Sequence, residues 1–295
     1  MISKRSFLMS LALLVWSPAG AQAPGGVTPP VAKDSLRFAA IGDWGTGDRE
    51  SYETAAQFAK ARGTFPFDFV VTLGDNIYGR ERPKDFQEKF ERPFKPLLDA
   101  GVKFYASLGN HDETNQIHYK LFNMNGKRYY TFKPRDGVRF FALDSNYMDP
   151  PQVEWLEKEL AASGSDWKIC FFHHPLYSSG ERHGPSTELR AILEPLFVKY
   201  GVNLVLSGHE HFYERIKPQR GIYYFISGSG GKLRRGGMNR SEITAAGNDQ
   251  DRGFVLFEIA GDKMHFQAIT RTGQKIDSGV LERPARAKVV SESRH

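Results

Sequence analysis

The feature that most constrains the fold of this chain is a pattern that occurs five times. An apolar run, predicted to be a strand, ends directly in metal-binding side chains, in four cases after a glycine. The five segments are Gly42-Asp43, Gly74-Asp75, Gly109-Asn110-His111, His173-His174 and Gly208-His209-Glu210-His211. In open α/β sheets, ligands bind beyond the carboxyl ends of the strands, so the pattern predicts that these side chains meet in one crevice. Each glycine is expected to allow a sharp turn there.

Strands and helices are predicted to alternate in the first two thirds of the chain. Several strands are continuous apolar runs, which is typical of strands covered on both faces. The predicted strands are Leu36–Ile41, Phe67–Leu73, Val102–Leu108, Tyr129–Phe132, Val138–Asp144, Trp167–Phe172, Val202–Leu206, Ile222–Ile226, Phe254–Ile259 and Lys263–Thr270. The predicted helices are Glu50–Arg62, Asp85–Asp99, Gln152–Ala162 and Thr187–Tyr200. This order predicts an α/β layered domain with a mixed sheet and an antiparallel closing part.

The N-terminal segment has the order of a secretory signal peptide. Lys4 and Arg5 precede an apolar run to Trp16, and small residues follow up to Ala21. We therefore predict a signal peptide at 1–21 and a flexible linker at 22–34, with the mature protein periplasmic or secreted. An uncleaved membrane anchor is the alternative interpretation. The single cysteine, Cys170, lies in an apolar run and is expected to be a buried small side chain without a disulfide.

The net charge bears on the kind of partner. It is +6 for the whole chain, and removal of residues 1–21, which hold Lys4 and Arg5 and no acidic residue, lowers it to +4. This charge suits an anionic substrate and is equally compatible with an ordinary solvated surface. Basic residues form only a modest stripe between Lys217 and Arg240, so nucleic acid is not expected as a partner. No stable membrane association is expected after signal cleavage.

The donor types at the five strand ends favour a metal site. Carboxylate, amide and imidazole groups together bind hard and borderline metal ions. A single Gly-Asp pair is more often a simple turn, and a single histidine is more often structural. Five such ends in series are harder to explain as turns. His209 and His211 are two residues apart on an extended segment, so their side chains face the same side.

The motifs GDWG, GDNIY, GNHD, HHP and GHEH resemble those of the purple acid phosphatases, within the calcineurin-like metallophosphoesterases. The tartrate-resistant type is the most similar, and the resemblance runs from about Leu36 to Arg283. Tyr78, three residues after Asp75, is the more specific mark of the purple acid phosphatases. The resemblance implies a β-sandwich of two mixed sheets flanked by helices, in α/β/β/α layers, over residues 35–284. A disordered tail is expected at 285–295.

The resemblance also implies a dinuclear metal centre. Fe(III) is expected on Asp43, Asp75, Tyr78 and His211, and Fe(II), Zn or Mn on Asp75, Asn110, His173 and His209. Asp75 bridges the two ions in this assignment. His173 is the expected ligand in place of His174, because the family motif has its histidine two positions before Pro175.

The implied activity is that of an acid phosphatase, which hydrolyses phosphate monoesters with a metal-bound hydroxide as nucleophile. Asn110, His111 and His183 are expected to bind the substrate, and His111 and His183 are the candidate proton donors. His183 could also be an ordinary exposed loop residue. The expected partner is a phosphorylated small molecule, and the expected state is a monomer.

Two other functions stay open from the sequence. The first is a phosphodiesterase on the same scaffold, acting on cyclic nucleotides or phospholipid head groups. The second is a non-catalytic exported metal-binding module. Against the second, all expected ligands and both candidate proton donors are present.

Overall fold

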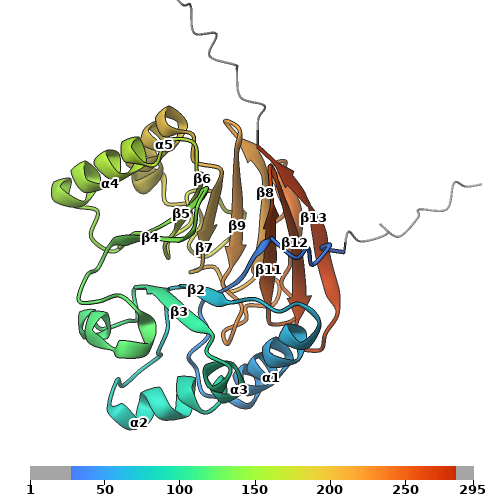
Figure 1. Ribbon diagram of the computed structural model, residues 1–295. Helices are drawn as coiled ribbons and strands as arrows, with labels where there is room; N and C mark the ends of the chain where they lie inside the picture. The colour runs from blue at the N-terminus through green and yellow to red at the C-terminus, as the bar shows by residue number, and fades with distance from the viewer. Residues whose placement is uncertain (1–27, 284–295) are drawn as a thin grey trace, which may run out of the picture.

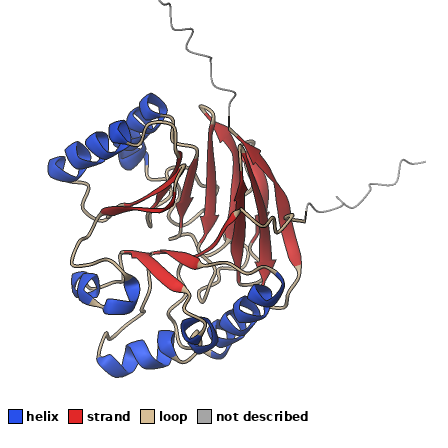
Figure 2. Cartoon of the chain, viewed as in Figure 1, coloured by secondary structure: helices blue, strands red, loops and turns tan. Residues whose placement is uncertain are grey.

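Two β-sheets packed face to face form the centre of the protein in the computed structural model, which describes residues 28–283 (Figures 1 and 2). The predicted signal peptide and tail lie outside the described residues. Of the predicted linker, residues 28–34 are described, and the N–H groups of Val31 and Ala32 donate to the buried Glu258 carboxylate. Among the described helices, none has the length and apolar character needed to span a bilayer.

The first sheet has six strands. In spatial order they are β13 (Lys275–Glu282), β12 (Lys263–Thr270), β11 (Gly253–Ala260), β1 (Leu36–Ile41), β2 (Phe69–Leu73) and β3 (Lys103–Ser107). Strands β1, β2 and β3 are parallel, and the remaining neighbours pair antiparallel. The carboxyl ends of the three parallel strands therefore lie at one edge.

The second sheet has seven strands. In spatial order they are β10 (Thr244–Asn248), β8 (Tyr213–Gln219), β9 (Ile222–Ser227), β7 (Leu204–Ser207), β6 (Trp167–Phe171), β5 (Val138–Ala142) and β4 (Tyr130–Arg135). Strands β5, β6, β7 and β9 are parallel neighbours, and the outer pairs are antiparallel. Both sheets are thus mixed, which confirms the predicted sandwich.

Helices cover the outer faces of the sandwich (Figure 1). They are α1 (Arg49–Thr64), α2 (Pro83–Phe86) and α3 (Lys95–Asp99) beside the first sheet, and α4 (Pro150–Ala162) and α5 (Thr187–Tyr200) beside the second sheet. Cys170 is buried beneath α4 and α5 and has a free thiol, as expected. Aromatic side chains fill the space between the sheets, where the ring centroids of Phe38 and Phe140 are 5.0 Å apart.

Two parts of the secondary structure differ from the prediction. The single helix expected over Asp85–Asp99 is divided into α2, a π-helix at Gln87–Glu91 and α3. Pro93 and Pro96 explain the break, because each lacks the N–H that a continuous helix needs. Strands β8, β10 and β13 and the 3₁₀ helices Thr114–His118 and Lys120–Phe122 were not predicted. β10 and β13 are edge strands with few buried residues, so they lack the apolar pattern.

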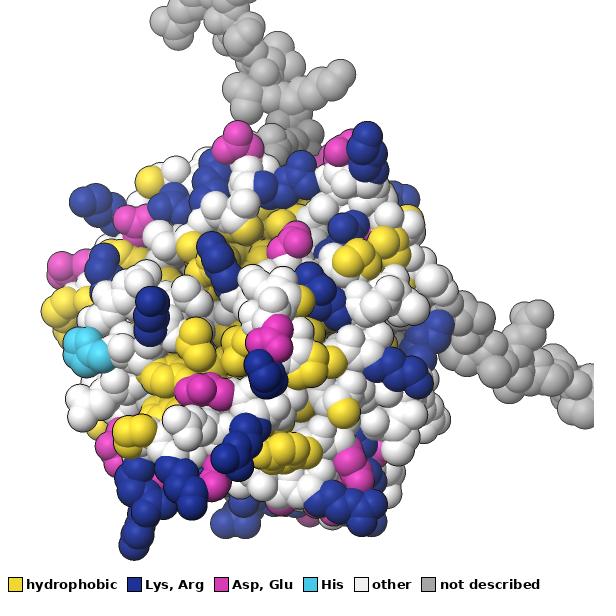
Figure 3. Space-filling model, turned by 60° about the horizontal axis from the view of Figure 1, so that its bottom comes forward, with side chains coloured by type: hydrophobic (Ala, Val, Ile, Leu, Met, Phe, Trp, Pro, Cys, Tyr) yellow, Lys and Arg dark blue, Asp and Glu magenta, His cyan; other side chains and the backbone are white. Residues whose placement is uncertain are grey.

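The outer surface has mixed composition. Figure 3 turns the lower side of Figure 1 toward the viewer, and on this face Lys and Arg side chains are dispersed among acidic and apolar ones. Such a mixture is typical of a solvated surface over helices.

Candidate metal centre

The sandwich brings all nine predicted site residues to one place. Asp43, Asp75 and Asn110 follow the adjacent parallel strands β1, β2 and β3, as the strand-end argument predicted. His173 follows β6, and His209 and His211 follow its neighbour β7 in the other sheet. Tyr78 and His111 lie further along the same two turns as Asp75 and Asn110. His183 comes from the segment between β6 and α5.

The glycines at these strand ends act differently from the prediction. Only Gly74 has the left-handed backbone that permits a sharp turn, with φ of +80°. At positions 109 and 208, glycine is needed because the carboxylates of Asp75 and Asp43 approach the backbone too closely for a side chain. A Cβ on Gly109 would lie 2.2 Å from Asp75 Oδ1, and a Cβ on Gly208 would lie 2.5 Å from Asp43 Oδ2. The absent side chains leave room for the carboxylates.

Three of the predicted ligands themselves have left-handed backbones. The φ angles are 54° at Asp43, 51° at Asp75 and 68° at His209. This conformation costs a non-glycine residue on the order of 1–3 kcal/mol and is concentrated at functional sites. The left-handed backbone turns the chain at the ends of the strands, where these three side chains join the cluster.

Asp43, Tyr78 and His211 form the first group of donors. Asp43 Oδ1 lies 3.1 Å from the Tyr78 hydroxyl, which donates to it, and 3.3 Å from His211 Nε2. The Tyr78 hydroxyl is 3.4 Å from the same nitrogen. Asp43 Oδ2 accepts the backbone N–H of His209 at 2.8 Å. These are three of the four residues expected to hold Fe(III).

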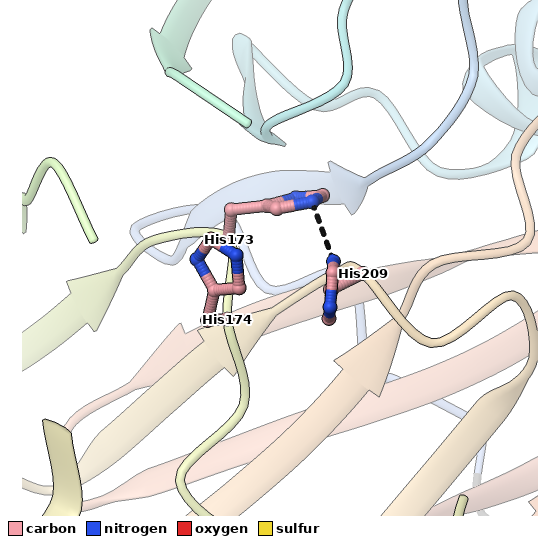
Figure 4. Close-up of side chains that lie close together, drawn as sticks. All are labelled: His173, His174 and His209. Carbon is pink, nitrogen blue, oxygen red and sulfur yellow. Dashed lines mark hydrogen bonds between the residues drawn. The ribbon is translucent and has the colours of Figure 1, made fainter. Parts of the chain in front are cut away.

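His173, Asn110, His209 and Asp75 form the second group. His173 Nε2 is 2.9 Å from Asn110 Oδ1, 3.1 Å from His209 Nδ1 and 3.4 Å from Asp75 Oδ1. Figure 4 shows the contact between the rings of His173 and His209. Asp75 also faces the first group, because Asp43, Asp75 and His173 each offer a ligand atom within 4.8 Å of the others. Asp75 thus lies between the two groups.

The donor chemistry of the second group fits a cation. His173 Nδ1 lies 2.8 Å from the Leu73 carbonyl oxygen, which can only accept, so the proton of the neutral ring is on Nδ1. The lone pair of Nε2 then faces two further acceptors, Asn110 Oδ1 and Asp75 Oδ1. Asp75 Oδ2 is buried and has no hydrogen-bond partner among the described residues. Asp75 Oδ1 accepts the backbone N–H of His111 at 3.0 Å, so it is partly satisfied. A cation between His173 Nε2, Asn110 Oδ1 and the Asp75 carboxylate would satisfy the lone pairs that remain.

The electrostatics of the protein groups agree with this reading. Burial, reinforced by the neighbouring Asp75, raises the pKa of Asp43 well above its usual value. Burial lowers the pKa of His209 to about 2 and that of His211 to about 4. Burial and the adjacent carboxylates raise the pKa of the Tyr78 phenol. Metal ions favour the deprotonated form of every ligand. They would therefore oppose the raised pKa values of Asp43 and Tyr78, whereas the lowered values of the two histidines already favour the neutral form that binds metal.

His174 occupies a different position from His173. Its Nδ1 is 2.9 Å from Ser145 Oγ, and its ring centroid is 4.4 Å from that of His209. His183 contacts the same ring at a centroid distance of 4.3 Å. His174 could geometrically join a cluster with His173 and His209, whereas His173 is the fully buried member with contacts to Asp75 and Asn110.

Two cavities open at the cluster and share Asn110. The smaller cavity has a volume of about 310 Å³. Five predicted ligands, both candidate proton donors and three cationic side chains line it. These residues are Asp75, Tyr78, Asn110, His111, Arg182, His183, His209, His211, Lys232 and Arg234. The larger, of about 630 Å³, lies beside Asn110 and His174 and has Tyr147 and Ile192 among its lining residues. Asp43 and His173 are fully buried beneath the cluster.

Two residues at this site, Asp112 and Lys232, were not among the predicted site residues. Asp112 accepts the backbone N–H groups of Asn76 and Gly109, each at 2.8 Å, and so joins the turns after β2 and β3. Burial raises its pKa to about 7. Its place in the Gly109–Asp112 motif was the available signal. Lys232 places its Nζ 4.7 Å from the Tyr78 ring centroid, and no sequence pattern marks it.

Comparison with known proteins agrees with the site. Residues 36–213 match the family model described as Calcineurin-like phosphoesterase. The chain is 28% identical over 301 residues to the tartrate-resistant acid phosphatase type 5 of Rattus norvegicus, covering 85% of this chain and 92% of the relative.

Two solved structures share the fold. One is the purple acid phosphatase PPD1 from yellow lupin seeds, with a TM-score of 0.73 and 20% identity over 88% of this chain and 55% of that chain. The other is GAP50, described as the anchor in the inner membrane complex of Plasmodium, with a TM-score of 0.75 and 21% identity over 85% of this chain and 90% of that chain. The predicted resemblance is confirmed: the chain belongs to the calcineurin-like phosphoesterases and is similar along most of its length to a tartrate-resistant acid phosphatase.

Proposed function

We propose that this protein hydrolyses phosphate monoesters at a dinuclear metal centre. The observation that carries the proposal is the convergence of His173 Nε2, Asn110 Oδ1 and the Asp75 carboxylate, whose buried Oδ2 has no hydrogen-bond partner among the described residues. Similarity to a tartrate-resistant acid phosphatase over 85% of the chain supports the same activity.

Seven residues would hold the metals. Asp43, Asp75, Tyr78 and His211 would bind one ion, and Asp75, Asn110, His173 and His209 the other. When bound, two ions supply Lewis acidity toward the phosphoryl oxygens and lower the pKa of water. The buried Tyr78 phenol keeps its proton unless a strongly Lewis-acidic ion displaces it, which favours Fe(III) at the first position. Fe(II), Zn or Mn is proposed at the second.

Cationic side chains would bind and orient the substrate phosphate. Arg182, Lys232 and Arg234 line the same cavity as the cluster. They offset the negative charge of the phosphoryl group, together with hydrogen bonds from Asn110 and His111. In the overall reaction the oxygen of water bonds to phosphorus, and the bond from phosphorus to the ester oxygen breaks.

His111 and His183 are the candidate donors of the proton that the leaving alcohol takes up. The electron pair of the broken bond stays on the ester oxygen, which takes one proton from a histidine, while the attacking water gives up one. The His111 ring centroid is 5.0 Å from that of Tyr78, and the His183 ring contacts His209. Both histidines are exposed to the substrate side of the cluster.

A phosphodiester substrate is the second candidate. The 630 Å³ cavity beside Asn110 offers room for a second ester group. A panel of 4-nitrophenyl phosphate and bis(4-nitrophenyl) phosphate between pH 4 and 8, with metal content measured on the same samples, separates the two activities. We expect faster turnover of the monoester, mildly acidic conditions to be optimal and two metals per chain. Turnover of the diester alone would overturn the monoesterase proposal.

We also propose that the chain is exported and processed. Support comes from Lys4 and Arg5, the apolar run after them and the small residues up to Ala21. Mass spectrometry of the mature protein is expected to find Gln22 at the N-terminus. An N-terminus that retains residues 1–21 would contradict this.

A further inference from the structure

The position of His183 is set by its backbone. Within residues 28–283, its ring makes no hydrogen bond, and the side chain is exposed. The ring nevertheless lies 4.3 Å from that of His209 and 6.4 Å from that of His211. The segment 178–184, which carries His183, must therefore be held in place by contacts elsewhere along it.

Glu210 makes the contact nearest to His183. It stands between His209 and His211 in the sequence, and its side chain is fully buried. Its Oε1 accepts the backbone N–H of Gly184 at 2.7 Å, directly after His183. Its Oε2 has no hydrogen-bond partner among the described residues and lies 3.9 Å from Nη1 of Arg234. The carboxylate thus connects the turn that bears two predicted metal ligands to the segment that bears His183.

The same segment leaves room for this carboxylate at Gly180. A Cβ at that position would lie 2.0 Å from Glu210 Oε1. The backbone of Gly180 has no left-handed φ angle, so a side chain is excluded there by the carboxylate alone. Gly180 and Gly184 therefore both lie against the same buried carboxyl group.

A second buried glutamate holds the other end of the segment. Glu214 accepts the Ser179 N–H at 2.9 Å and the Ser179 hydroxyl at 2.6 Å. The Asn239 N–H donates to the Ser179 carbonyl at 2.9 Å, and Gly180 forms an isolated bridge with Met238. Beyond this base, the Glu181 N–H donates to the Gly237 carbonyl at 3.2 Å and the Ser186 N–H donates to the Pro175 carbonyl at 2.8 Å. Between these two contacts, the side chain that holds the tip at His183 and Gly184 is Glu210.

We propose that Glu210 is a positioning residue that holds His183 over the metal cluster, an inference that rests on the proposed function. A carboxylate is suited to this position because it accepts strongly from N–H groups and its charge lies beside Arg234. The ligands and the proton donor are then set by one turn, so that their spacing is preserved when substrate binds.

The first test measures the contact without any catalysis. Hydrogen exchange of the Gly184 amide is followed in metal-free protein for the parent and for Glu210→Ala and Glu210→Gln. We expect exchange roughly tenfold faster or more in Glu210→Ala, because its acceptor is lost, and near-parent exchange in Glu210→Gln, which keeps an oxygen acceptor. Glu258→Ala is the control, since it removes a fully buried carboxylate far from segment 178–184. Equal exchange in all four proteins would overturn the proposal.

The second test uses two leaving groups on metal-loaded protein. Nitrophenolate leaves readily without a proton, whereas the alkoxide of ethyl phosphate needs one. Glu210→Ala is expected to lower kcat for ethyl phosphate roughly tenfold more than for 4-nitrophenyl phosphate, with Glu210→Gln much closer to the parent. A purely structural role would lower both rates in the same proportion, which is the expected result for Glu258→Ala. An unchanged ratio in Glu210→Ala would overturn the positioning role.

Gly180→Ala probes the same contact from the opposite side. The added Cβ displaces the Glu210 carboxylate, so this variant is expected to reproduce both the faster exchange and the selective loss on ethyl phosphate, and it serves where Glu210→Ala fails to fold or to retain metal. In the double variant the methyl group occupies the space that Glu210 leaves, so the two effects are expected to be non-additive. Additive effects would contradict the contact.

The two proposals fail in distinguishable ways. If the parent turns over neither substrate while Gly184 exchange still depends on Glu210, the phosphatase proposal fails and the contact stands. If the parent is active and exchange does not depend on Glu210, the phosphatase proposal stands and the inference about Glu210 fails.

Discussion

His209 Nδ1 lies 3.1 Å from His173 Nε2, although the two residues are 36 positions apart and follow different strands. Such close approach of two ring nitrogens suits two neutral imidazoles, in which one N–H can donate to the lone pair of the other ring, whereas two positive charges would repel. Burial ensures this, since it lowers the pKa of both imidazoles. The two histidines follow the adjacent strands β6 and β7, and both are predicted metal ligands.

Gly109→Ala should remove metal without unfolding the chain. The new Cβ would lie 2.2 Å from both Asp75 Oδ1 and the Asp75 backbone nitrogen, so the residue between the two donor groups must move. We expect at least one metal per chain to be lost and turnover to fall by a factor of roughly 100 or more. Elemental analysis and the melting temperature check this. Gly164→Ala, where open space surrounds the added Cβ, is the control for a glycine replacement, although its φ of +53° adds some strain.

Tyr78→Phe should abolish visible colour. The phenolate is the only proposed ligand that gives a charge-transfer band with Fe(III), and phenylalanine has no oxygen to bind it. The visible spectrum is compared with that of Tyr147→Phe, an exposed tyrosine beside the other cavity. A coloured Tyr78→Phe protein with bound iron would contradict the assigned ligand.

Replacement of His111 and His183 together by Asn should reduce turnover and leave metal content unchanged. General acid–base groups contribute roughly 10²–10⁴-fold to rate, so we expect kcat to fall within that range. His118→Asn, an exposed histidine outside the cavity, should have parent activity. Loss of metals from the double variant would show that these residues act as ligands instead.

The stability of metal-free protein should depend on His209 at acidic pH. Its pKa is depressed to about 2 in the fold, below the usual 6.5, so the unfolded chain binds a proton that the folded chain does not. Its contribution is therefore complete above about pH 6.5 and decreases as pH falls toward the folded value. Per proton, the free energy of unfolding changes by about 1.4 kcal/mol per pH unit.

Asp43 and Asp112 have raised pKa values and contribute the opposite slope. The comparison is therefore between the parent and His209→Gln, each unfolded with urea at several pH values between 4 and 6.5. The variant should lose stability less steeply with acid, by up to one proton. Identical slopes would contradict the neutral, buried state of His209.

Phe38→Ala should destabilise the sandwich. Phe38 is fully buried between the sheets and contacts the rings of Phe69, Phe140 and Phe257. Removal of a buried aromatic side chain costs about 3–5 kcal/mol, which urea unfolding measures. Tyr147→Ala, on the exposed rim of the larger cavity, should change stability much less.

Much of the fold was predictable because its strands are apolar throughout. Strand β1 and helix α5 have the predicted bounds, since β1 is an almost continuous buried run and the buried residues of α5 recur at helical spacing. Edge strand β13 was missed because Leu281 is its only fully buried residue, and its pairing with β12 depends on a neighbour in space. The single helix predicted over Asp85–Asp99 is interrupted in the structure, because Pro93 and Pro96 lack the N–H groups that a continuous helix needs.

The sequence by itself determined which donor types are present, their order along the chain and the family to which they belong. Those properties are local, since each donor follows its own apolar strand. Only the tertiary structure decided that Asp43 accepts the N–H of a residue 166 positions away, that glycines make room for carboxylates and that Glu210 reaches Gly184. Each of these contacts joins segments that are far apart in the sequence. The packing of the two sheets brings the segments together, and no local sequence pattern encodes that packing.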